Sequence, residues 1–109
     1  MLAVRHVVDK GGLGIALQTR PFDPAEYLDT PEAVAEYLTA AFESDDHAVI
    51  ADALGMAAKA RGMSQLVRDT GLARPALYRA LSADGHPEFE TVLKVLRALG
   101  VTLRPATIA

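Results

Sequence analysis

The sequence predicts a small all-α bundle of five helices followed by one short strand, and three features of its 109 residues indicate this. Apolar residues recur at three- and four-residue spacing along most of the chain after residue 22. Aspartate or threonine followed by proline, a helix start signal, precedes two of these runs. In MSQLVRDTGLARPALYRALS, over residues 63–82, two short helical runs meet at a single glycine. A chain of this length is expected to form one domain.

The first half of the chain is expected to be helical from FDPAEYL onward. Asp23 caps this short segment, and Thr30 caps a longer helix over PEAVAEYLTAAFES. The next helix is predicted to start at Asp45 or Asp46 and to run to about Arg61, where Gly62 ends it. The residues expected to face the core are Val34, Tyr37, Leu38, Ala41, Phe42, Ile50, Ala53, Leu54 and Ala57. Small residues around Gly55 predict close helix packing.

Residues 64–82 have the pattern of a helix-turn-helix DNA reader. Ser64 is predicted to cap the first helix, Gly71 to form the turn, and a second helix to begin near Arg74. Leu77 and Leu81 would pack inward, which leaves the opposite surface of the second helix free to read bases and phosphates. The residues expected to contact operator DNA are Ser64, Gln65, Arg74, Pro75, Ala76, Tyr78 and Arg79. The alternative is an ordinary helical hairpin with solvated arginines.

The C-terminal part predicts a last helix over PEFETVLKVLRALG and a strand over VTLRP, stopped by Pro105. The apolar stripe expected to enter the core is Phe89, Val92, Leu93, Leu96 and Leu99. Val95 lies off this stripe, and the strand has an unpaired edge. A single recognition helix covers few base pairs, so a homodimer is expected. Its predicted surface is formed by Val95, Leu99, Val101 and Leu103.

Charge divides the chain into two unlike halves. Residues 1–56 hold three Lys/Arg against ten Asp/Glu, a net charge of −7, whereas residues 57–109 hold eight against four, a net charge of +4. The helix-turn-helix pattern therefore lies in the basic half, which suits an approach to phosphates. The acidic half predicts either attraction to a basic protein or, for any single residue, a solvated helix surface.

Several function classes find little support in the sequence. The absence of cysteine excludes disulfides and thiolate chemistry and is typical of a reducing cytoplasm. His6, His47 and His86 are widely separated, and the run Asp45, Asp46, His47 is better explained by helix capping than by a cation site. KGGLG is not followed by the residues that complete a phosphate loop, and charges interrupt the apolar start of the chain. We therefore expect no enzyme, no cofactor, no metal and no membrane segment.

The blocks TRPFDPAEYL, PEAVAEYL, RGMSQL, TGL, ALYRAL and FETVLKVLRALG together resemble the addiction-module antidote proteins, HigA-like members of the lambda-repressor/Cro helix-turn-helix type. The resemblance covers about residues 19–104 and leaves residues 1–18 outside it, as either an N-terminal arm or the result of a start codon assigned too far upstream. It implies an antitoxin that binds a RelE/ParE-type toxin encoded beside it and represses their shared promoter as a dimer. The alternative is a free-standing repressor of Cro/CI type without a toxin.

On the matching positions the recognition helix falls on Arg74 to Ser82. Ala73 stands where the family commonly has Ser or Thr, so one capping hydrogen bond is expected to be missing. The implied toxin class includes members with basic surfaces, so the resemblance also implies a negative surface on the antitoxin. Glu32, Glu36 and Glu43 are the expected toxin-binding residues, since they lie on one side of their helix.

Overall fold

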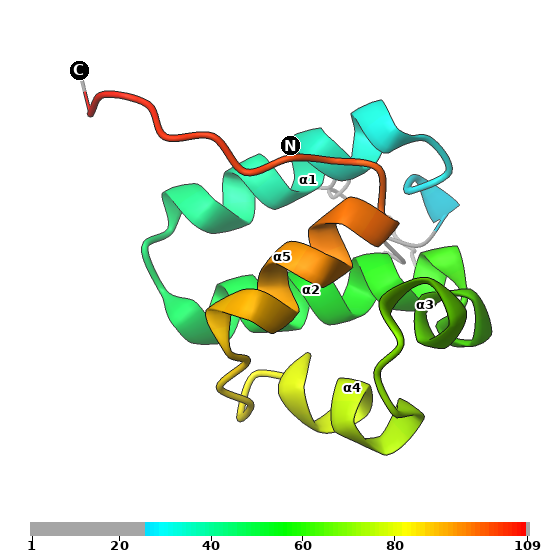
Figure 1. Cartoon of the computed structure of the whole chain (residues 1–109). Coiled ribbons are helices and arrows are strands. Elements are labelled where there is room, and N and C mark those ends of the chain that lie inside the picture. Colours follow the sequence, from blue (N-terminus) through cyan, green and yellow to red (C-terminus); the bar gives the residue numbers. More distant parts are fainter. Residues whose placement is uncertain (1–25, 109) are drawn as a thin grey trace, which may run out of the picture.

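The computed structural model describes residues 26–108, and within this range the chain forms five α-helices (Figure 1). They are α1 (Pro31–Glu43), α2 (His47–Arg61), α3 (Met63–Thr70), α4 (Arg74–Ala80) and α5 (Phe89–Ala98). The predicted all-helical bundle of five helices is confirmed. The expected arm over residues 1–18 and the Asp23 cap lie outside the described residues.

The helix starts in the first half follow the predicted caps. The Thr30 hydroxyl accepts a hydrogen bond from the backbone N–H of Ala33 at 3.1 Å, and Pro31 opens α1. The Asp46 carboxylate accepts from the N–H of Ala48 at 2.9 Å and so caps α2. These oxygens satisfy backbone donors that have no partner within their helix.

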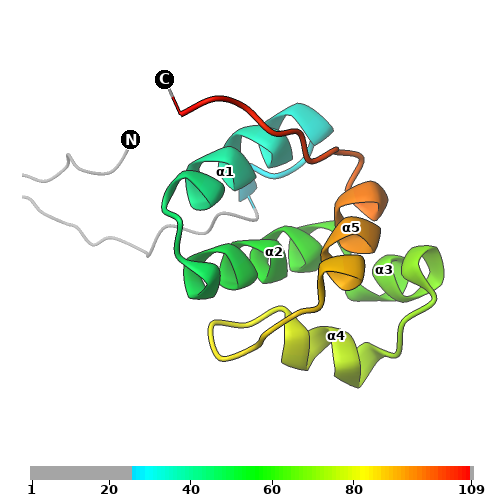
Figure 2. The ribbon, with the colours of Figure 1, turned by 60° about the vertical axis from the view of Figure 1, so that its left-hand side comes forward.

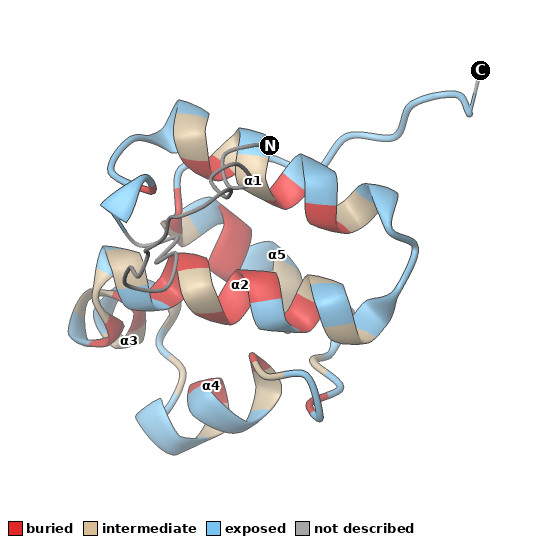
Figure 3. Ribbon diagram, turned by 180° about the vertical axis from the view of Figure 1, so that it is seen from behind, coloured by how far each residue is buried: buried red, intermediate tan, exposed pale blue. Residues whose placement is uncertain are grey.

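Helix α2 is the centre of the bundle, with α1 on one side and α4 on the other (Figures 1 and 2). Its buried residues are Ala51, Ala53, Leu54, Gly55, Ala57 and Ala58, and Figure 3 shows buried segments of α2 alternating with intermediate and exposed ones. A side chain at Gly55 would collide with the backbone carbonyl of Leu81. The close packing predicted around Gly55 is therefore confirmed, and it brings the end of α4 against α2.

The prediction of which α5 residues enter the core is wrong for the N-terminal part of the helix. Phe89 is 66% exposed and Leu93 is 41% exposed, whereas Val95 is fully buried and Leu99 is 3% exposed. The side of α5 that packs on the bundle is centred on Val95 and Leu99, so residues 89 and 93 fall at its edge. Val95 and Leu99, which were also predicted to form the dimer surface, are both buried in the core of this chain, and their dimer role stays a prediction.

The C-terminal segment after Gly100 is not a strand. Residues 101–108 have no regular secondary structure, and they run past α1 to the C-terminal end (Figure 2). A strand requires hydrogen bonds to a neighbouring strand, and the other described elements are all helices, so the predicted strand over 101–104 has nothing to pair with. Val101 is half-buried and donates its N–H to the Leu96 carbonyl at 3.0 Å, while Leu103 is exposed.

None of the helices in residues 26–108 is long and apolar enough to cross a membrane.

Candidate nucleic-acid interface

Helices α3 and α4 form a compact unit of two short helices joined by a tight turn, and each contributes a buried leucine. Leu66 of α3 and Leu77 of α4 are both fully buried, so the inner sides of the two helices share one core. Gly71 ends α3 in the left-handed conformation, with φ of 73°, which glycine adopts at little cost. The predicted turn at Gly71 and the inward position of Leu77 are confirmed.

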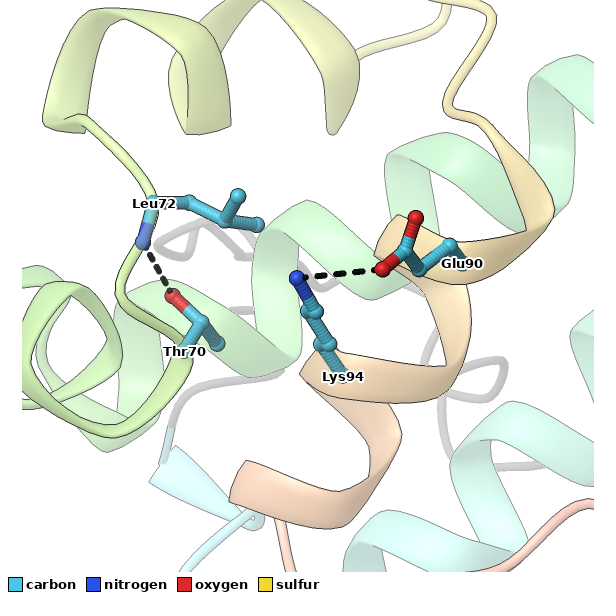
Figure 4. A network of polar contacts seen from close by, with 4 residues as sticks. All are labelled: Thr70, Leu72, Glu90 and Lys94. Carbon is cyan, nitrogen blue, oxygen red and sulfur yellow. Dashed lines mark hydrogen bonds and ion pairs between the residues drawn. The ribbon is translucent and has the colours of Figure 1, made fainter.

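The turn is closed by the side chain of Thr70. Its hydroxyl donates to the Leu66 carbonyl at 2.6 Å and accepts from the N–H of Leu72 at 3.2 Å. Figure 4 shows the second of these bonds, beside the ion pair of Glu90 and Lys94 on α5. The direction of α4 relative to α3 is thus fixed by local hydrogen bonds as well as by burial.

Ser64 does not cap α3, contrary to the prediction. The helix begins one residue earlier, at Met63, and Gly62 occupies the cap position, where no side chain accepts a hydrogen bond. Met63 is buried, so its place in the core draws it into the first turn. The Ser64 hydroxyl instead accepts a hydrogen bond from the Arg74 guanidinium at 2.7 Å. Two residues predicted to contact DNA are therefore brought together across the turn.

Helix α4 turns one polar surface to solvent. Arg74, Pro75, Tyr78 and Arg79 are exposed, and Tyr78 is 48% exposed. Ala76 is half-buried, so it contributes less to this surface than predicted. As expected, Ala73 offers no capping side chain. Within residues 26–108, the side chains of Tyr78 and Arg79 have no hydrogen-bonding partner in the protein, which leaves their donors available to a ligand.

Gln65 is held in a small network that the sequence reasoning missed. Its side-chain amide donates to Asp69 at 2.9 Å and its carbonyl accepts from Arg68 at 2.8 Å. Spacings of three and four residues on one helix could have indicated both contacts. The network fixes the Gln65 amide beside Arg68, on the helix that precedes the turn.

The loop between α4 and α5 folds back on the end of α4. The N–H of Gly85 donates to the Ser82 carbonyl at 2.8 Å, and a side chain at Gly85 would collide with the backbone of Arg79 and Ala80. The His86 ring lies 5.0 Å from that of His47, measured between ring centroids, so the loop also contacts the start of α2. These contacts fix the position of the C-terminal end of α4 relative to the loop and to the start of α2.

The three glutamates predicted to bind a toxin lie away from this unit. Glu32, Glu36 and Glu43 are exposed on α1, which is separated from α4 by α2 (Figure 1). On the same helix, Tyr37 is half-buried. Burial raises the pKa of the Tyr37 phenol, and the carboxylate of Asp52 adds to the rise. The acidic surface and the arginine-bearing surface thus occupy opposite sides of the bundle.

The residues Asp45, Asp46 and His47 form the turn and the first residue of α2. Asp46 caps α2, and Asp45 adopts a left-handed backbone conformation, with φ of 58°, in the turn before it. Within the described part of the chain, no group of three histidine or carboxylate side chains is arranged to hold a metal ion.

Residues 18–107 match a protein family described as "Probable addiction module antidote protein". This chain belongs to that antidote family. A Haemophilus influenzae protein described as uncharacterised is 45% identical over 84 residues, which cover 77% of this chain and 87% of that protein. No solved structure matches the chain. Membership of the antidote family favours a regulatory protein with a toxin partner over a catalytic one.

Proposed function

We propose that this antidote acts as a HigA-like antitoxin with two activities, the neutralisation of a RelE/ParE-like toxin and the repression of its own promoter in the cytoplasm. The chain's membership of the antidote family supports the first activity. The α3–α4 unit, which we propose to be a helix-turn-helix, supports the second, because its exposed surface carries arginine and tyrosine side chains of the kind that can bind bases and phosphates.

The observation that carries the DNA-binding proposal is the set of free donors on α4. Arg79 and Tyr78 are exposed without protein partners among residues 26–108, and Arg74 is exposed beside them. An arginine can donate two hydrogen bonds to the O6 and N7 of guanine in the major groove, and tyrosine can donate to phosphate. Helix α4 is proposed to be the recognition helix, with Ser64, Gln65 and Arg68 of α3 near the phosphates.

The acidic surface of α1 is the proposed toxin-binding surface. No Lys or Arg occurs between Arg20 and Lys59, so nothing on α1 neutralises Glu32, Glu36 and Glu43. A partner with a basic surface would be attracted here, and DNA would be repelled. The two proposed activities therefore use different sides of the molecule.

The deciding experiment measures binding to the promoter fragment upstream of the gene. The double variant Arg74→Ala/Arg79→Ala should lose about 1–3 kcal/mol for each arginine that reads a guanine. Arg104→Ala is the matched control, since Arg104 is exposed in the C-terminal segment, outside the helix-turn-helix unit. Unchanged affinity of the double variant would exclude α4 as the recognition helix.

Co-expression with the product of the adjacent open reading frame tests the toxin activity separately. Growth arrest by that product alone and rescue by this antidote would support the antitoxin. A neighbouring gene whose product is harmless, together with intact operator binding, would favour the free-standing repressor.

A further inference from the structure

The hydroxyl of Ser64 differs from the other serine and threonine hydroxyls in its hydrogen-bonding partner. Five others within residues 26–108 make hydrogen bonds, and each bonds to a backbone group of its own helix or turn. Ser64 is bonded to a charged side chain instead, the Arg74 guanidinium, at 2.7 Å. It is also exposed, in the first turn of α3. An accessible hydroxyl oxygen is therefore in contact with a cation.

Three arginines lie near Ser64 in the sequence or in space. Arg61 precedes it by three residues, Arg68 follows it by four and so lies on the same side of α3, and Arg74 contacts it. All three arginines are exposed, and none of them forms an ion pair with a carboxylate within residues 26–108. The one acid of α3, Asp69, accepts a hydrogen bond from a neighbouring amide. Ser64 thus has positive surroundings whose charge no acid neutralises by direct contact.

We propose that Ser64 is a phosphorylation site and that its phosphate releases the antidote from DNA. A protein kinase transfers the γ-phosphoryl group of a nucleoside triphosphate to the serine. A bond forms between the γ-phosphorus and the Ser64 oxygen, the bond to the diphosphate leaving group breaks, and the hydroxyl proton passes to the kinase's general base. Arg61 supplies a positive charge of the kind by which kinases select their substrates. The effect on DNA rests on the proposed function, whereas the modification itself does not.

The start of α3 gives a kinase access to Ser64. Ser64 is the second residue of this helix, and Gly62 at the cap position has no side chain to accept hydrogen bonds from the first turn. Opening that turn therefore breaks no capping bond. The backbone leaves the helical conformation directly before the turn, since Gly62 has φ of 105°. The serine can thus be presented to an enzyme at the end of a helix and not from its middle.

The phosphate on Ser64 acts as an internal competitor of DNA. It carries a charge of about −1.5 to −2 and three strong acceptor oxygens. It can therefore accept two hydrogen bonds from the Arg74 guanidinium, where the hydroxyl accepts one. Arg74 is then held away from guanine, and the added charge repels the DNA phosphates that α3 is proposed to contact. Because this phosphate belongs to the same chain, it competes at a high effective concentration.

Mass spectrometry of the chain purified from the cells that encode it tests the modification directly. Trypsin cleaves after Arg61 and Arg68, which gives the peptide 62–68, and Ser64 is the only residue of this peptide with a hydroxyl group. A phosphate on the peptide therefore identifies the modified residue without ambiguity. We expect the phosphorylated peptide in growing or in starved cells. A peptide without phosphate under both conditions would overturn the proposal.

Operator binding by the full chain with phosphoserine inserted at position 64 tests the effect of the phosphate. The affinity should fall by about tenfold or more, and further than in Ser64→Ala, because the phosphate also occupies Arg74. Phosphoserine in place of Thr39 is the matched control, since Thr39 is exposed on α1, on the other side of α2 from α4. Circular dichroism should match the wild type in both proteins. Equal operator affinity with and without the phosphate on Ser64 would exclude the switch.

A measurement without DNA separates this proposal from the proposed function. Phosphorus NMR follows the second ionisation of the phosphate on Ser64, and the Arg74 cation should lower the pKa of that phosphate relative to the Arg74→Ala background. An equal pKa in the two backgrounds would overturn the pairing of the phosphate with Arg74. If the unmodified chain binds no operator but the difference in pKa is present, the DNA-binding proposal fails and the pairing is supported.

Discussion

Arg74, at the first position of α4, donates a hydrogen bond to the hydroxyl of Ser64 in the first turn of α3, with 2.7 Å between nitrogen and oxygen. The bond joins the two helices through exposed side chains, whereas Leu66 and Leu77 join the same two helices to the buried core. It restricts the rotamers of a long side chain that would otherwise be free in solvent. The guanidinium of Arg74 is thus oriented before any ligand arrives.

Ser64→Ala should weaken operator binding less than Arg74→Ala does. The serine variant keeps the charge of Arg74 and loses its orientation together with any contact of the Ser64 hydroxyl to phosphate, so we expect a cost of about 1 kcal/mol or less. Arg74→Ala should cost about 1–3 kcal/mol if the residue reads a guanine. Fluorescence anisotropy on the single and double variants gives the coupling energy. A value of zero would mean that the bond to Ser64 does not act in DNA binding.

Gly55→Ala should destabilise the fold and disturb α4. The added methyl group meets the carbonyl of Leu81, so α2 and the end of α4 must move apart, at a cost of about 1–3 kcal/mol in the free energy of unfolding. Urea denaturation gives this value, and operator affinity at low temperature should also fall. Asp52→Ala, an exposed change on the same helix, is the control and should leave both quantities close to wild type.

Reversing two charges on α1 should slow toxin capture. Glu32→Lys/Glu36→Lys removes the attraction for a basic partner, so the association rate should fall and become less dependent on salt, while operator affinity stays unchanged. Stopped-flow or surface plasmon resonance with the purified toxin measures the rate. The control, Asp84→Lys/Glu88→Lys, changes the same number of charges beyond α1 and should not slow association. Equal rates for all three proteins would make the α1 glutamates a solvated surface only.

Tyr37→Phe should remove part of the protein's sensitivity to high pH. The pKa of Tyr37 is raised in the folded chain by burial and by Asp52, so in alkaline solution the unfolded chain loses this proton first. The associated stability is therefore fully present below about pH 10 and declines as the pH rises further. Urea midpoints from pH 8 to 11 should fall less steeply for the phenylalanine variant. Parallel curves would show that Tyr37 does not contribute.

Short sequence patterns correctly predicted the helix caps of α1 and α2 and the turn, because these features depend only on residues that are close together in the chain. Thr30 and Asp46 cap helices because their side chains reach nearby backbone donors, and Gly71 turns the chain because of its own conformational freedom. The Ser64 cap was wrong because burial of Met63 moved the helix start, which depends on distant neighbours. The same reason explains the two errors in α5, since only the packing of several helices decides that Val95 is inside and Phe89 outside.

The exposure of the candidate DNA-binding residues on α4 was predicted from the sequence, but the hydrogen bonds that they make were not. Periodicity alone identified Tyr78 and Arg79 as exposed on α4. The bond between Arg74 and Ser64 joins residues ten positions apart, so it depends on the angle between two helices that no spacing rule supplies. The predicted strand over 101–104 failed for a different reason. Alternating apolar residues fit a strand pattern even where the described part of the chain offers no neighbouring strand for pairing.

The acidic and basic parts of the chain lie on different sides of the folded molecule, and this gives the molecule an electric dipole. Between residues 26 and 56 there are eight acids and no Lys or Arg, and three of these acids lie on α1, on the side of α2 opposite α4 (Figures 1 and 2). The negative field of DNA exerts a torque on such a molecule. This torque turns α1 away from the DNA and α4 toward it before the two surfaces touch. Fewer collisions are then lost to wrong orientations. A net charge of −3 is therefore compatible with fast association to DNA, because the direction of the dipole, and not only the total charge, governs the encounter.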